Sequence, residues 1–78
     1  MATKHDLTNS FVDLYALTGK TPDTELSIFI ENGTIYLDDE VTPTAVISFK
    51  EGEWVFAKAP QLWVRSVHLE ATIVVSGR

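Results

Sequence analysis

The stretch Ile30-Glu31-Asn32-Gly33-Thr34-Ile35 places an Asn-Gly pair between two runs in which apolar and polar residues alternate. Asn-Gly is the strongest short-range signal for a two-residue β-hairpin, because a type I′ turn needs positive φ at both central residues. The sequence therefore predicts two antiparallel strands around this turn, with Ile30 opposite Ile35 and Phe29 opposite Tyr36. Strand alternation further predicts one aliphatic face turned to the core, made of Leu26, Ile28, Ile30, Ile35 and Leu37.

A second hairpin is expected between residues 45–49 and 53–57, turning at Glu51-Gly52. A two-residue loop predicts an apolar face that contains Ile47, Phe49, Trp54 and Phe56. Glu-Gly is a weaker turn signal than Asn-Gly, and a longer loop would shift the register by one residue. Such a shift would exchange the two faces of both strands.

The remaining segments complete an all-β prediction. Residues 1–6 are polar and are expected to form a flexible N-terminus ahead of a single β-domain over residues 7–78. Residues 7–17 fit either a helical stripe or a short strand that runs into a turn at residues 18–23, and the strand is favoured. With two further strands at residues 61–66 and 71–76, the sequence predicts a small antiparallel β-sandwich or partly open barrel of about six to seven short strands.

Length and charge exclude several classes of function. The chain has 78 residues, no cysteine and a formal net charge of -5. No basic run is present to neutralise phosphates, so we expect no nucleic-acid partner, and the acidic balance argues against an anionic membrane surface. The first 20 residues lack the apolar stretch of a secretory signal, and no segment is long and apolar enough to span a bilayer. A domain this small is marginal alone and has no disulfide, so an oligomer or a docked partner is expected to stabilise it.

Residues with catalytic or metal-binding chemistry do not form a convincing pattern. His5 and His68 have no visible partner that would make a metal site or orient a nucleophile. The acidic run Asp38-Asp39-Glu40 lacks the spacing of a calcium loop. Gly19-Lys20-Thr21 matches only the end of a phosphate-binding loop. We therefore expect a protein that is not an enzyme and that uses no cofactor or metal.

Large aromatic side chains are the better candidates for binding. A small sandwich needs large inward residues, so the core is expected to take Phe49, Trp54, Phe56 and Trp63. Trp63 and Arg65 share a strand face, which would allow the guanidinium to lie over the indole or both residues to take part in an interface. Phe29 and Tyr36 lie opposite the aliphatic face of their own hairpin. The interface candidates are Phe11, Phe29, Tyr36, Trp63 and Arg65.

Three stretches of the chain resemble small accessory proteins encoded among phage structural genes. They are residues 9–19 (Asn-Ser-Phe-Val-Asp-Leu-Tyr-Ala-Leu-Thr-Gly), the Ser-Ile-Phe-Ile segment at 27–30 and Leu-Trp-Val-Arg at 62–65. The resemblance implies a compact β-domain that decorates a head or sits at a tail attachment point. Its partner would be the lattice of a major capsid or tail protein, and the chain would form a homo-oligomer, with a trimer favoured. The protein would be made in the host cytoplasm and would reside in the virion.

Two functional hypotheses follow. The leading one is a non-enzymatic virion accessory protein of decoration or cement type, which binds a larger assembly through apolar and aromatic surface. The alternative is a small acidic inhibitor of a host enzyme or defence complex, in which Asp38, Asp39, Glu40, Glu51 and Glu53 imitate nucleic-acid charge. The inhibitor's binding would fall steeply with salt, whereas apolar docking would not.

Overall fold

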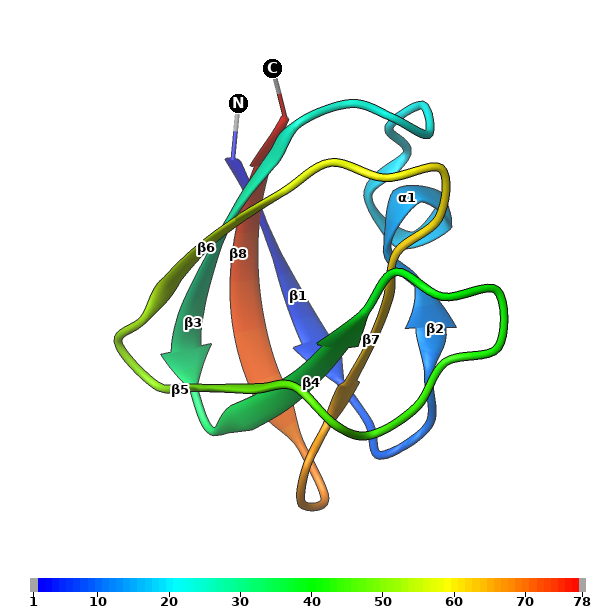
Figure 1. Cartoon of the computed structure of the whole chain (residues 1–78). Helices are drawn as coiled ribbons and strands as arrows, with labels where there is room; N and C mark the ends of the chain where they lie inside the picture. Colours follow the sequence, from blue (N-terminus) through cyan, green and yellow to red (C-terminus); the bar gives the residue numbers. More distant parts are fainter. Residues whose placement is uncertain (1, 78) are drawn as a thin grey trace.

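Eight short strands form two packed antiparallel sheets in the computed structural model, which describes residues 2–77 (Figure 1). The first sheet contains, in order, β1 (Ala2–Leu7), β8 (Ala71–Gly77), β3 (Leu26–Asn32) and β6 (Trp54–Ala57). The second sheet contains, in order, β2 (Val12–Asp13), β7 (Trp63–Ser66), β4 (Thr34–Asp38) and β5 (Ser48–Lys50). The all-β prediction of a small antiparallel sandwich is confirmed.

The aliphatic face predicted from the alternation at residues 26–37 forms the centre of the core. Its five members are buried: Leu26, Ile28, Ile30, Ile35 and Leu37. They meet aliphatic side chains of β7 and β8, including Val64, Ile73 and Val75. Burying these side chains between two sheets is the main source of stability in such a fold.

The predicted Asn-Gly hairpin is wrong, because β3 and β4 belong to different sheets. β3 pairs with β8 and β6, whereas β4 pairs with β7 and β5. Gly33 has a φ of +83°, but Asn32 does not take the positive φ that a type I′ turn would also require. Residues 32–34 therefore turn the chain from one sheet to the other, and each strand finds its partners far away in the sequence.

The second predicted hairpin is wrong for the same reason. Glu53 N–H donates to the Lys50 carbonyl at 3.1 Å, which closes a tight turn at Glu51-Gly52, but β5 then pairs with β4 and β6 with β3. Ile28 lies opposite Val55 in the first sheet, so Val55 points into the core. Trp54 and Phe56, on either side of it, point outward, and their predicted place in the core is wrong.

Residues 2–6 of the predicted N-terminal extension belong to a strand of the first sheet. β1 is an edge strand that pairs with β8 along its whole length, from Ala2 opposite Ser76 to Leu7 opposite Ala71. Its polar side chains are compatible with this position because an edge strand has a solvated face. Lys4 adds an exposed ion pair with Glu31 at 3.0 Å.

The ambiguous segment at residues 7–17 contains both of the elements that were considered. The two-residue strand β2 is followed by the short helix α1 (Leu14–Thr18). The Asp13 side chain accepts hydrogen bonds from Tyr15 N–H and Ala16 N–H, and Gly19 ends the helix in a left-handed conformation. No helix within residues 2–77 has the length and hydropathy needed to cross a membrane.

Candidate protein-interaction surfaces

Three aromatic side chains form a ridge on the outer face of the first sheet, and we call Phe29, Trp54 and Phe56 the aromatic ridge. Phe29 on β3 lies directly opposite Trp54 on β6, with ring centroids 5.0 Å apart. The Trp54 and Phe56 rings are stacked at 6.4 Å with planes 10° apart. Trp54 is 59% exposed and Phe56 is 62% exposed, so the ridge presents two large rings to solvent.

The position of the ridge follows from the register of β6. Val55 takes the core position opposite Ile28, and alternation along the strand then places both neighbouring rings outside. The predicted hairpin would set the faces of β6 from residues 45–49, whereas β6 pairs with β3 and its faces follow from that pairing.

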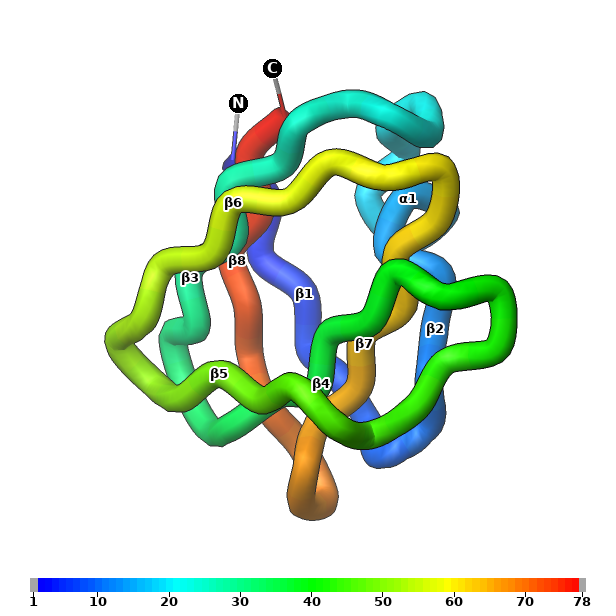
Figure 2. Tube along the Cα trace, viewed as in Figure 1, coloured from blue at the N-terminus to red at the C-terminus, as the bar shows by residue number. Residues whose placement is uncertain are grey.

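A pocket of about 330 Å³ lies beside Phe56, between β6 and the end of β4. Its apolar lining includes Phe49 of β5, Leu62 and the 57% exposed Ile47. Figure 2 shows how the chain before and after the β5–β6 turn diverges on either side of this region. The aromatic ridge is therefore continuous with a hollow at the edge of the sandwich, whose lining also includes Asp38, Asp39 and Lys58.

A second surface lies on the outer face of the second sheet, and we call Phe11, Tyr36, Trp63 and Arg65 the arginine face. The Arg65 guanidinium carbon lies 5.4 Å from the centre of the Phe11 ring and 5.0 Å from that of Tyr36. Arg65 also donates to the Asn9 carbonyl at 2.9 Å. All four side chains are only half-buried. The structure thus brings together four of the five predicted interface residues, with Phe11 and Tyr36 rather than Trp63 against the guanidinium, while Phe29 lies on the other sheet.

The histidines and the Gly-Lys-Thr stretch show no arrangement for chemistry. His5 Nε2 makes a 2.8 Å hydrogen bond with the Thr3 hydroxyl on β1, and His68 is exposed in the turn before β8. A phosphate-binding loop precedes a helix, whereas Gly19 follows one as its C-cap. These residues have structural or solvent-facing roles in the described chain.

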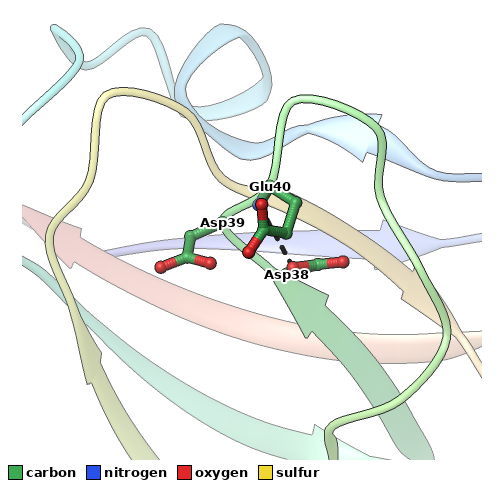
Figure 3. Close-up of side chains that lie close together, drawn as sticks. All are labelled: Asp38, Asp39 and Glu40. Carbon is green, nitrogen blue, oxygen red and sulfur yellow. Dashed lines mark hydrogen bonds between the residues drawn. The ribbon is translucent and has the colours of Figure 1, made fainter.

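The carboxylates of Asp38, Asp39 and Glu40 converge within 4.8 Å of one another (Figure 3). Asp38 is already used by its own loop: it accepts hydrogen bonds from Glu40 N–H at 3.1 Å and from the Thr44 hydroxyl and N–H. The backbone hydrogen bond from Thr44 is the main cause that lowers the pKa of Asp38, and the other bonds add to it. This arrangement gives the Asp38 carboxylate a structural role in the loop at residues 38–44.

No protein-family model matches the chain, and neither the curated proteins nor the solved structures give a significant match to it.

Proposed function

We propose that the protein is a non-enzymatic accessory structural protein that docks onto a larger protein assembly through the aromatic ridge. The supporting observation is the exposure of Trp54 and Phe56, at 59% and 62%, beside Phe29. Clusters of exposed apolar side chains mark interaction sites in soluble proteins, and tryptophan is enriched among residues that dominate binding energy. The assembly that we propose is the capsid or tail lattice of a virion, as the resemblance implies.

The ridge can supply a modest contact whose effect grows by repetition. Trp54 and Phe56 together expose on the order of 250 Å² of side-chain surface. Burying this area would contribute about 6 kcal/mol before the cost of association, which is itself at least about 4 kcal/mol. One such contact is weak, but a lattice that offers many equivalent sites would hold several linked copies far more tightly.

The proposal is tested by co-expressing the chain with capsid or tail proteins that assemble into particles and sedimenting those particles. A Trp54→Ser/Phe56→Ser variant should be lost from the particle fraction. Leu69→Ser is the matched control, because Leu69 is 83% exposed but lies in the turn before β8, so it should remain bound. Retention of the double variant at the wild-type level would contradict the proposal.

Tyr36→Ser and Phe29→Ser should be compared as separate variants in the same experiment. The two residues lie on outer faces of different sheets, so each variant tests one surface. Loss of binding with Phe29→Ser alone assigns docking to the aromatic ridge. Loss of binding with Tyr36→Ser alone would assign docking to the arginine face and would contradict docking through the aromatic ridge.

The acidic-inhibitor hypothesis has one geometric observation in its favour, namely the convergence of the three carboxylates of residues 38–40. Binding through these charges would weaken steeply as salt rises, because exposed charges are screened within about 10 Å at 0.1 M ionic strength. Docking through the aromatic ridge should persist in high salt. Repeating the sedimentation in high salt therefore separates the two hypotheses.

A further inference from the structure

We infer that the free edge of β6 pairs with the β6 edge of a second copy, so that two chains form one continuous sheet across a two-fold axis. This inference rests on the proposed function, since it takes the aromatic ridge as an assembly surface and names a second copy as its partner. β6 is the last strand of its sheet, and within residues 2–77 no strand pairs with its other side. An edge of this kind is a ready template for another strand.

The hydrogen-bond pattern identifies which backbone groups the edge offers. Ile30 N–H donates to the Glu53 carbonyl at 3.1 Å, and Ile28 lies opposite Val55. Hydrogen-bonded pairs alternate along an antiparallel ladder, so Val55 directs its N–H and carbonyl toward β3. Trp54 and Phe56 consequently direct theirs toward the free edge.

The backbone groups that Trp54 and Phe56 direct to the free edge match those of a second copy related by two-fold symmetry. If the axis passes between Val55 of one copy and Val55 of the other, Trp54 lies opposite Phe56 of the second copy, and the reverse pair is equivalent. Each pair exchanges two backbone hydrogen bonds, and both rings lie on the same outer face of the joined sheet. The ring contacts that already run from Phe29 to Trp54 at 5.0 Å would then continue across the axis.

The available area is that of a weak dimer. The two rings expose on the order of 250 Å² per copy. Specific interfaces bury about 800 Å² per partner, and weak ones less than about 600 Å². The backbone edge of β6 adds to this area. We therefore expect a weak dimer, with dissociation between micromolar and millimolar concentration.

The test is sedimentation equilibrium of the whole chain from micromolar to millimolar concentration. The mass should rise from that of one 8.7 kDa chain to that of two. Trp54→Lys should remain monomeric because it places a charge opposite Phe56 of the second copy, whereas the control Leu69→Lys should dimerise normally. A mass that stays monomeric for the wild type, a trimer, or a dimer that survives Trp54→Lys would overturn the inference.

Amide hydrogen exchange on the wild-type protein tests the register directly. Protection of the Trp54 and Phe56 amides should appear only at concentrations where the dimer forms, while the Val55 amide should be protected throughout. Fast exchange of both edge amides in a demonstrated dimer would show that another surface is used.

A monomer whose particle binding still depends on the ridge would overturn this inference and leave the proposed function standing, with another protein as the partner of the ridge. A dimer whose particle binding does not depend on the ridge would overturn the proposed function and leave the dimer inference standing.

Discussion

Replacing Gly33 by alanine should destabilise the protein far more than the same change at Gly52. Both glycines have left-handed φ values, +83° and +88°. At Gly33 an added Cβ would lie 3.0 Å from Ala71 Cβ, 3.2 Å from Ala71 Cα and 3.2 Å from the Glu70 carbonyl oxygen. At Gly52 it would meet nothing within 4 Å. Gly52→Ala therefore isolates the backbone effect, and Gly33→Ala adds the packing effect.

The expected magnitudes follow from these contacts. A left-handed conformation costs a residue with a Cβ about 1–2 kcal/mol relative to glycine. Forcing a methyl group into a filled space costs about 1–3 kcal/mol more. Two of the three contacts at Gly33 are with backbone atoms, which cannot rotate away. We expect losses of about 1 kcal/mol for Gly52→Ala and about 3 kcal/mol for Gly33→Ala, from a total of roughly 4–12 kcal/mol for a domain of this size.

Urea unfolding monitored by tryptophan fluorescence measures both losses, since the chain has two tryptophans on different sheets. The same experiment distinguishes the sheet-to-sheet corner from the hairpin that the Asn-Gly pair predicts. In a two-residue hairpin Gly33 would lie at an exposed tip, and its substitution would cost no more than that of Gly52. Equal losses for the two variants would refute the packing of Gly33 on Ala71.

Three smaller perturbations test other parts of the structure. Tyr15→Phe should lower the free energy of unfolding by about 1–3 kcal/mol. The buried Tyr15 hydroxyl donates to the Thr24 carbonyl at 2.8 Å and accepts from Ala59 N–H at 3.3 Å. An unchanged midpoint of thermal unfolding would show that water replaces the lost hydroxyl. Asp13→Ala should lower the free energy of unfolding by about 1 kcal/mol because it removes the N-cap of α1, whereas Asp13→Asn keeps a capping side chain and should lower it little. Equal losses of stability for the two variants would argue against capping. The pKa of Asp38 is lowered in the folded protein chiefly by the Thr44 backbone hydrogen bond, so its stabilising effect is present above the ordinary pKa of 3.8 and is lost as pH falls through the lower folded value. The Thr44 amide signal in NMR should follow this titration in the wild type and lose it in Asp38→Asn.

The burial of the aliphatic residues could be predicted from sequence, whereas the strand partners could not. Whether Ile28 or Phe29 faces the core is decided by local alternation, and the structure buries Ile28 as predicted. Whether β3 pairs with β4 or with β8 is decided by packing between segments about 40–50 residues apart along the chain. The Asn-Gly pair expresses only a local preference for a hairpin turn. In the folded protein β3 and β4 each pair with two other strands instead of with one another.

The candidate surfaces show the same limit at the level of single residues. Residue type and strand alternation predict Phe11, Tyr36 and Arg65 as interface residues, and these three lie together on one outer face. The sequence predicts Trp54 and Phe56 in the core only if the turn at Gly52 joins paired strands, and it does not. A shift of one residue along β6 would exchange its buried and exposed side chains. The pairing of Val55 with Ile28 determines which side chains are buried.

The outward position of Trp54 and Phe56 has a physical consequence for the edge that they occupy. Turning β6 over would place two large rings where one valine now fills the space against Ile28, and overpacking of that kind is destabilising. The core therefore requires the rings to be outside. Edge strands are usually protected by proline, by inward charges or by a covering segment, and the four residues of β6, Trp54–Ala57, include neither proline nor charge. Two exposed rings on an unprotected edge are a liability in a free monomer, and they become useful when a second β6 pairs with that edge.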